Sequence, residues 1–600
     1  MTRALSRSVL CLTLCSIGFA QAPHVAPPAT DDVLPASTYA TMQFGGLSAC
    51  RRSATAMPFA ALVDNFLKRI PAASRAARVD HWLDEGAQHV QQHLQQLGLS
   101  AADLRAVVGQ PMTLAIGRLS IEGMGPSVAL VIEEGESAAA IGRCMAALEN
   151  LARQSGAGIV FDDVKIGDLA VRHAAIAEGP PVFLGSVGGY FVLTNSRGQL
   201  REIADVVRGV QPGLARTSRL ADLRRRLPQP PLASVFVNTA SVASMLDNHL
   251  PYEAAAFGAA LGLGQVDALY AGTTASAQGG SDVIHFGLGG SEHGLMKALV
   301  ALPADLGFAS LCSQNTVVFG AGSFDAQAVL DAFAHLVELL PPAAQRDVDD
   351  NLRRDIDRGL RRFGTTREAV AGLVHAFGNQ VGFALSLEKG AVPKPEVLLH
   401  VAVRDAAVVA PFLQQLEAMA AERGHVEWKT RKVGERDIRF CNINLDDVDL
   451  KLSPCYVLTE KALLLGSDTA VLVRALRQGD QPEESFAAQP DFKALQAAAA
   501  GGSGVLHLRL FRGVEIGWRT VETMLYPQLD AHKEEVGFSS EALPDAESMA
   551  KALGTSTFVY NVDDDGITWK SHGTLTFGSL LAGFGALADE VLSRASGKIY

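Results

Sequence analysis

Residues 432–476 read KVGERDIRFCNINLDDVDLKLSPCYVLTEKALLLGSDTAVLVRAL, and a similar succession occurs earlier in the chain. There, residues 165–176 read KIGDLAVRHAAI, and residues 180–207 read PPVFLGSVGGYFVLTNSRGQLREIADVV. Similar residues in KIGDLAVR and KVGERDIR fall at one constant offset of 267 positions. Stacked repeat proteins have periods of about 20–50 residues, so a period this long predicts duplication of a whole domain.

The similarity extends along most of the chain and predicts two diverged copies of one unit. Residues 126–156 match residues 395–424 in the order and length of their elements. The tripeptide Leu-Pro-Ala at residues 34–36 recurs at residues 302–304. We therefore expect a first repeat at 34–300 and a second at 301–600, with a boundary uncertain by about ten residues.

The hydrophobic periodicities within each unit predict an α+β fold. The run SVALVIEE (127–134) is typical of a strand, whereas Ile141, Cys144 and Leu148 recur at helical spacing. Gly188-Gly189 lies between two apolar runs, which indicates a hairpin, and Ser196 is placed to cap the helix that follows. This order predicts a mainly antiparallel sheet with helices packed on one face.

The N-terminal residues indicate export. Arg3 and Arg7 precede and flank a short apolar run that ends at Gly18-Phe19-Ala20, as in a cleaved signal peptide spanning residues 1–20. The Pro-rich residues 21–33 then read as a flexible lead-in. We expect a periplasmic or secreted protein.

Length and charge exclude several classes of protein. A chain of 600 residues exceeds the usual size of one domain, and its 48% hydrophobic content argues against disorder. A net charge of −12 makes nucleic acid an unsuitable partner, because nucleic-acid binding relies on excess positive charge. After residues 1–20, no uncharged apolar segment is long enough to span a membrane.

One helix-like segment carries residues that could bind a metal ion. His81, Glu85, His89 and His93 are spaced four apart and so share one helix face. Imidazole and carboxylate groups in this arrangement are suited to zinc, usually with a further ligand from elsewhere. A solvated polar stripe explains the same residues, and the corresponding region of the second repeat has no histidine.

Two cysteines of the second repeat predict a disulfide. If the hairpin of residues 441–455 turns at Asp447-Val448-Asp449, Cys441 and Cys455 face each other across two strands. The first repeat has neither cysteine, as expected if the two act as a pair. A different turn register would separate them.

Three features of the sequence occur together: the opening LPASTYATMQF (34–44), the segment PLASVFVNTASVASML (231–246) and the repeated units of strand, helix and hairpin. In these features the chain resembles a bacterial family of secreted proteins that is defined only as a domain of unknown function. The resemblance spans most of residues 34–600 and implies an extracytoplasmic α+β protein. The family supplies no active-site residues and implies no cofactor.

These observations favour a non-enzymatic binding or scaffold protein of the cell envelope, and they leave catalysis open. No nucleophile elbow, H-E-x-x-H or C-x-x-C motif occurs, so the catalytic residues are unknown. We expect a protein or small-ligand partner in the groove between the two repeats, since ligand pockets favour domain interfaces. The alternative is a metal-dependent hydrolase that uses the histidine stripe.

Overall fold

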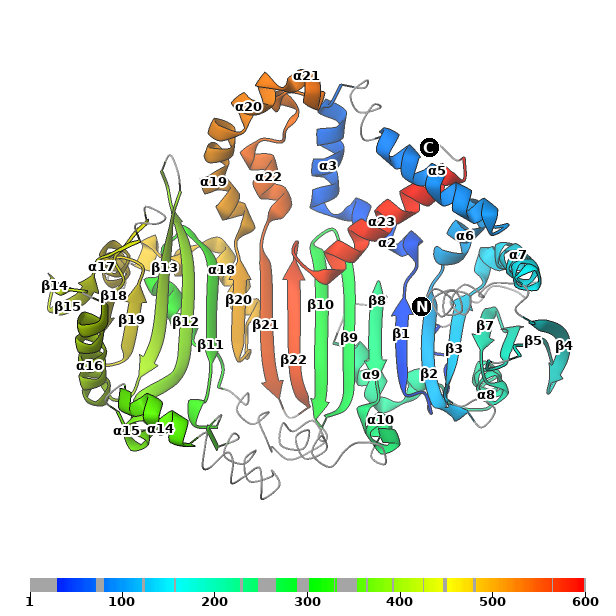
Figure 1. Cartoon of the computed structure of the whole chain (residues 1–600), viewed down its shortest axis with the longest axis horizontal. Helices are drawn as coiled ribbons and strands as arrows, with labels where there is room; N and C mark the ends of the chain where they lie inside the picture. Colours follow the sequence, from blue (N-terminus) through cyan, green and yellow to red (C-terminus); the bar gives the residue numbers. More distant parts are fainter. Residues whose placement is uncertain are drawn as a thin grey trace.

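The computed structural model describes most of residues 30–597 as one layered α+β assembly (Figure 1). Outside the description are residues 1–29, 72–79, 121–124, 156–157, 178, 227–229, 247–265, 289–301, 329, 332–352, 363–364, 391–392, 425, 446–449, 479–481, 564 and 598–600. Among the described residues, twenty strands form one continuous sheet. The predicted signal peptide and most of the predicted lead-in lie outside the described residues.

One half of the sheet comes from the N-terminal part of the chain. From the outer edge to the middle, its strands are β4 (Val160–Ile166), β5 (Leu169–Ala175), β6 (Val182–Val187), β7 (Tyr190–Thr194), β3 (Gly125–Glu133), β2 (Met112–Ser120), β1 (Ala40–Phe44), β8 (Ala233–Val237), β9 (Val266–Ser276) and β10 (Gly279–Leu288). Each neighbouring pair in this half is antiparallel.

The other half continues from β10 without a break. From the middle outward, its strands are β22 (Gly566–Gly573), β21 (Ser556–Asp563), β20 (Gly504–Leu508), β11 (Thr316–Ser323), β12 (Phe377–Glu388), β13 (Lys394–Val403), β19 (Ala462–Gly466), β18 (Cys455–Leu458), β15 (Arg436–Cys441) and β14 (Trp428–Val433). All of these pairs are also antiparallel, and a small separate hairpin joins β16 (Ile443–Leu445) to β17 (Leu450–Leu452).

Several locally predicted features are confirmed. The Gly188-Gly189 pair makes the turn between β6 and β7, and both glycines have positive φ. The side chain of Ser196 accepts a hydrogen bond from the Gln199 backbone N–H at the start of α8 (Arg197–Val207). The large antiparallel sheet and its helices confirm the α+β class.

Helices cover both faces of the outer strands, whereas the sequence predicted helices on one face. In the N-terminal half, α7 (Ala138–Gln154) packs on Ile132, and α8 packs against the opposite face with Val131. In the C-terminal half, α16 (Ala406–Gly424) packs on Leu463, and α17 (Thr469–Gln478) packs with Leu464. Neighbouring residues of these strands are apolar, so both faces of the outer strands need cover.

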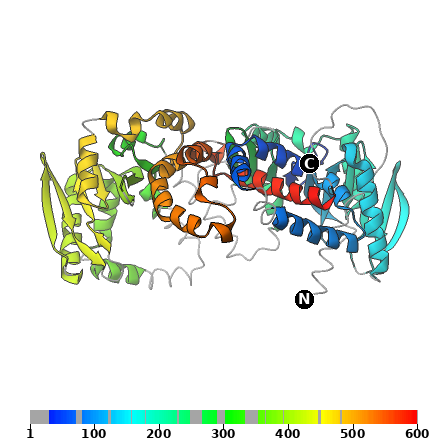
Figure 2. The ribbon, with the colours of Figure 1, turned by 90° about the horizontal axis from the view of Figure 1, so that it is seen from above.

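Further helices complete the two outer regions. They are α5 (His81–Gln96), α6 (Ala101–Val108), α9 (Ser218–Arg224), α10 (Thr239–Leu246), α14 (Arg353–Arg362), α15 (Arg367–Ala376) and α18 (Pro490–Ala498). Figure 2 shows two wings, with helices on both sides of each outer part of the sheet.

Above the central strands, helices from distant parts of the chain meet (Figure 1). They are α2 (Leu47–Ala56) and α3 (Pro58–Arg69) from the N-terminal part, with α19 (Leu510–Met524), α20 (Tyr526–Ala531), α21 (Lys533–Val536) and α22 (Ala546–Leu553) from the C-terminal part. Phe66 of α3 packs edge-on against Phe538, with ring centroids 5.7 Å apart. This contact links the two halves above the sheet.

The C-terminal helix α23 (Phe577–Ala595) packs on the N-terminal half. Gly585 allows close approach to α2, because an added Cβ would lie 2.4 Å from the Cβ of Cys50. The buried carboxylate of Asp589 accepts hydrogen bonds from Arg51 (2.8 Å) and Arg105 (2.7 and 2.9 Å). The end of the second predicted repeat is therefore bound to the first.

No helix in the described part of the chain is both long enough and apolar enough to cross a membrane.

Candidate functional site

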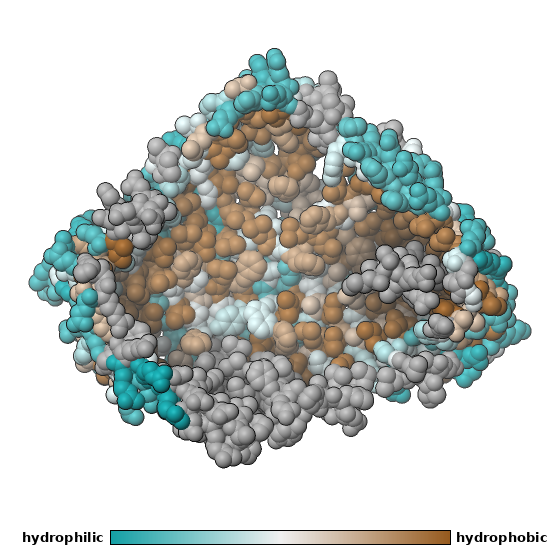
Figure 3. Space-filling model, viewed as in Figure 1, coloured by the Kyte–Doolittle hydropathy of each residue, from teal (hydrophilic) through white to brown (hydrophobic). Residues whose placement is uncertain are grey.

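The face of the sheet seen in Figure 1 leaves an apolar surface exposed over its central strands. Outward from these strands, α7 and α16 cover the same face. Figure 3 shows apolar residues gathered in the hollowed centre of this view. Here a depression of about 730 Å³, which we call the central groove, is lined by Asp282, Ile284, Phe286, Ala321, Gly504, Val505, Leu506, Phe558, Val559, Tyr560, Trp569, Lys570 and Ser571.

Strand register places the exposed apolar side chains on one face. Ile284 of β10 pairs with Trp569 of β22, which pairs in turn with Tyr560 of β21. Directly opposite residues in antiparallel strands project to the same side. By this rule the exposed apolar residues of the face are Met42, Ile116, Ile284, Val381, Phe383, Leu399, Leu506 and Trp569. Each of their side chains is more than a third exposed.

Glycines of β11 create a trough that adjoins the groove at Leu506. Gly320 and Gly322 of β11 pair with Leu506 and Gly504 of β20. A Cβ at Gly504 would lie 2.0 Å from the Tyr560 ring, so the ring lies directly over this backbone. At Gly320 the nearest atom to an added Cβ is 3.6 Å away, which leaves room for a side chain. Strand glycines of this kind often mark close approach of another group.

Asp282, Ser571 and Tyr560 of the groove already have partners within the protein, and Lys570 pairs with Val283 and Val559, so its side chain projects to the opposite face of the sheet. Asp282 accepts hydrogen bonds from Ser571 (2.7 Å) and from the first backbone N–H groups of α23, at Phe577 and Gly578. The Tyr560 hydroxyl donates to the Ser323 carbonyl oxygen at 2.9 Å. Trp569 packs edge-on against Phe286, with ring centroids 5.4 Å apart, and adds one indole N–H. The groove floor is thus almost entirely apolar.

The groove lies where the two halves of the sheet join. Ile284 and Phe286 belong to β10, the last strand of the N-terminal half, whereas Trp569 belongs to β22. Sequence analysis predicted a site between the halves but did not identify these residues. The sequence did carry one sign of this surface, because several strands have apolar residues at consecutive positions, such as VVF at 317–319. Such a run does not show which face of the sheet stays open.

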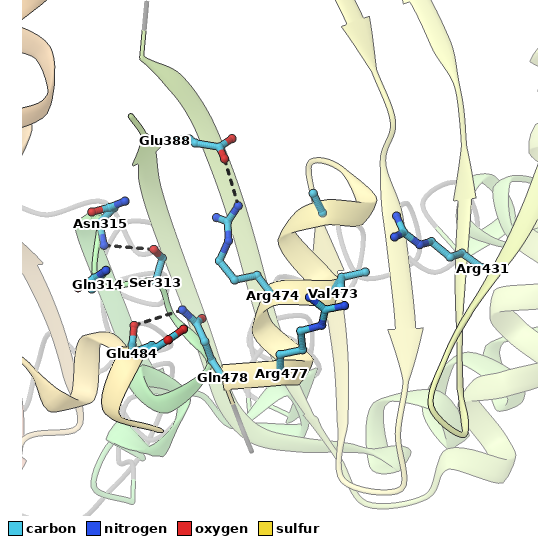
Figure 4. A pocket seen from close by; sticks show the side chains of 11 residues that line it. Ser313, Gln314, Asn315, Glu388, Arg431, Val473, Arg474, Arg477, Gln478 and Glu484 are labelled. Atoms are coloured by element: carbon cyan, nitrogen blue, oxygen red, sulfur yellow. Dashed lines mark hydrogen bonds and ion pairs between the residues drawn. The ribbon is translucent and has the colours of Figure 1, made fainter. Parts of the chain in front are cut away.

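A second depression, of about 580 Å³, lies at the outer part of the C-terminal half (Figure 4). Its polar lining includes Arg431 from β14 and Arg474 and Arg477 from α17. Arg474 forms ion pairs with Glu396 and, at 3.5 Å, with Glu388. Burial raises the pKa of Glu396, against the effect of the ion pair, because its side chain is only 2% exposed. The charge of Arg474 is therefore already paired inside the protein.

The predicted metal-binding stripe lies on the exposed surface of α5. His81, Glu85, His89 and His93 share the outer side of the helix, and Nδ1 of His89 lies 3.0 Å from the Glu85 carbonyl oxygen. Within the described residues, no group of three or more His, Cys, Asp or Glu side chains is placed to hold a metal ion. The zinc hypothesis therefore has no supporting geometry.

The cysteines predicted to form a disulfide are separate and free in the structure. Cys455 lies opposite Phe440, one position from the predicted register, so Cys441 projects to the other face of the sheet. Cys455 joins the core that includes α17, whereas Cys441 lies near Glu417 of α16. A strand register shifted by one residue therefore places the two cysteines on opposite faces of the sheet.

We expect thiol titration of the chain lacking residues 1–20 to find five free thiols in denaturant and very few under native conditions. All five cysteines are buried, and burial raises the pKa of the Cys455 thiol to about 12, so little reactive thiolate forms. The measurement uses a chromogenic disulfide reagent. If two fewer thiols were found in denaturant, and Cys441 and Cys455 were joined in one non-reduced peptide, the predicted disulfide would be shown to form.

Comparison with known proteins returned no match among protein-family models, curated proteins or solved structures. The resemblance to a secreted family stays a prediction from the sequence motifs.

Proposed function

We propose that this chain is an exported, non-enzymatic binding protein of the periplasm or the secreted space, and that its ligand occupies the central groove. The supporting observation is the groove itself, whose volume of about 730 Å³ falls within the usual range of small-molecule pockets. Its exposed apolar side chains extend over neighbouring strands. A continuous apolar surface on a soluble protein usually marks an interaction site.

We also propose that the chain consists of two diverged copies of one α+β unit. Strand order supports this proposal, because the strands on either side of the β10–β22 pair follow one another in the same chain order. Outward from the centre, β9, β8, β1, β2 and β3 correspond to β21, β20, β11, β12 and β13. The groove would then lie at the junction of the copies.

The chemistry of the groove favours binding over catalysis. Asp282, the acidic residue of the lining, is held by the N-terminus of α23 and by Ser571. General acid–base catalysis needs a group within reach of the substrate proton, and this carboxylate is committed to structural hydrogen bonds. A metal-dependent hydrolase is the alternative, and it would require His81, His89 and their neighbours to recruit a further ligand.

Native mass spectrometry of the protein, purified from its own envelope without detergent, tests this function. We expect a chain that begins near residue 21 and carries an added organic mass, which is released by organic solvent. The added mass should be lost in Trp569→Ala and retained in Trp82→Ala, because Trp82 is exposed on α5 outside the groove lining. An unliganded wild-type chain would contradict the proposal, and a chelator-sensitive metal ion would favour the hydrolase.

A further inference from the structure

We infer that the central groove, together with the glycine trough of β11 that adjoins it, binds an extended hydrocarbon chain, the acyl chain of a monomeric lipid. This inference rests on the proposed function and specifies the chemistry of the ligand. It follows from the hydrogen-bonding state of the floor, from the shape of the trough and from the apolar surface that adjoins it.

Hydrogen bonding distinguishes a hydrocarbon from a peptide. Each strand under the groove, from β10 to β11, is paired on both sides, so its backbone N–H and C=O groups are committed to the sheet. A buried peptide needs partners for its own backbone groups, because a buried N–H or C=O group without a partner is destabilising. Apart from the Trp569 indole, the polar side chains of the floor are already engaged. A hydrocarbon needs no such partners.

The trough has room for a narrow, flexible chain. Gly320 and Gly322 carry no side chain on the open face, and Leu506, Phe383 and Val381 project beside them. An added Cβ at Gly320 would lie 3.6 Å from the Val505 carbonyl oxygen and 3.9 Å from Leu506 Cδ1. Both are ordinary van der Waals distances. The space above this backbone can therefore be occupied by methylene groups.

The apolar surface continues from the groove onto α23. The backbone N–H of Phe577 contacts the groove residue Asp282, so the helix starts at the groove. Phe577, Leu580, Phe584 and Leu587 then follow at helical spacing and are all exposed. An acyl chain that extends beyond the trough would find further apolar contacts there.

Gly320→Leu should block the site without unfolding the protein. An added Cβ meets only ordinary van der Waals contacts, and Gly320 has no positive φ that would strain another residue, so a leucine side chain is expected to fill the trough. The matched control is Gly86→Leu on α5, where an added Cβ meets no atom within 4 Å. Leu506→Gln is a second variant that keeps the trough open and removes apolar surface.

The measurement is fluorescence titration of the delipidated full mature chain with dansylaminoundecanoic acid, and with dansyl-glycine as a short-chain control. We expect the long-chain probe to bind, dansyl-glycine to bind far more weakly, and phospholipid monomers to displace the long-chain probe. Gly320→Leu and Leu506→Gln should each lose about tenfold or more in affinity, since each buried methylene contributes about 0.8 kcal/mol. Gly86→Leu should bind as the wild type does.

Several outcomes would overturn the inference. Equal affinity for both probes, or unchanged long-chain binding in a folded Gly320→Leu variant, would exclude a chain in the trough. Recovery of a peptide in the native complex would leave the proposed binding function intact but refute the acyl chain. A stable dimer that buries Trp569 would identify a second copy of this chain as the occupant.

Discussion

Asp589→Asn is expected to lower the free energy of unfolding by about 3 kcal/mol, because it leaves two guanidinium groups without their shared carboxylate. The side chain of Asp589 is only 4% exposed, and it joins α23 to Arg51 of α2 and Arg105 of α6. Removal of one member of a buried ion cluster costs about 3–5 kcal/mol. We expect the lower end of this range, since Arg51 and Arg105 are partly solvated.

Urea denaturation of the chain lacking residues 1–20 measures this effect. Asp168→Asn is the matched control, because it makes the same change in an exposed ion pair with Arg208, and its midpoint should not shift measurably. A midpoint for Asp589→Asn that coincides with the control would show that packing alone holds α23. Its small buried residues, including Ala582 and Gly585, would then supply the contact.

The same carboxylate predicts a pH dependence of stability. Burial alone would raise the pKa of Asp589, but hydrogen bonds and charge from Arg105 and Arg51 outweigh burial and lower the pKa. A carboxylate with a lowered folded-state pKa stabilises the fold fully above its unfolded value of about 3.9. That stabilisation is lost as the pH falls below this value. Asp589→Asn should therefore show a shallower loss of stability at acid pH than the wild type.

Arg509→Ala is expected to destabilise the protein by about 3–5 kcal/mol, the other large effect. The Arg509 side chain is 2% exposed and pairs with Asp491 at 2.5 Å. It also donates at 2.8 Å to the carbonyl oxygens of Gln314 and Thr316, at the start of β11. Its guanidinium lies over the Phe486 ring, 4.9 Å from the centroid. Truncation removes the hydrogen bonds to Asp491 and to both carbonyl groups.

Two further variants, compared with Arg509→Ala, separate the contributions. Arg509→Lys keeps the charge but loses the forked donor geometry, and we expect it to recover only part of the stability. The double variant Arg509→Met with Asp491→Leu removes both charges and should recover most of it. Thermal unfolding checks the order wild type, double variant, then Arg509→Ala. If the double variant were no more stable than Arg509→Ala, the hydrogen bonds from Arg509 to the two carbonyl oxygens would account for the stabilisation.

Arg509 also bears on the proposed binding site. It follows directly after β20 and holds the start of β11, the two strands that form the glycine trough. Its hydrogen bonds should therefore keep the trough in shape. The sequence does not indicate this role, because nothing distinguishes Arg509 there from other charged residues near strand ends. Its near-complete burial is known only from the packing of residues far apart in the chain.

Local features were predictable because each depends on neighbouring residues. The hairpin at Gly188-Gly189 needs two residues that adopt positive φ, and glycine does so without steric cost. The cap at Ser196 needs a side-chain oxygen next to the free N–H groups of a helix. The Cys441–Cys455 interpretation depended on the exact turn of a hairpin, and the observed register is shifted by one residue.

By itself the sequence determined the α+β class, the antiparallel strands and the order of elements, because alternation, helical spacing and turn residues act over a few positions. Only the tertiary structure decided that β10 joins β22, that α23 packs on the N-terminal half, and that the central strands keep one apolar face open. Apolar residues occupy both faces of many of these strands. Over β9 and β10 the cover comes from α2 and α23, which lie hundreds of residues away in the chain, and no local pattern predicts their position.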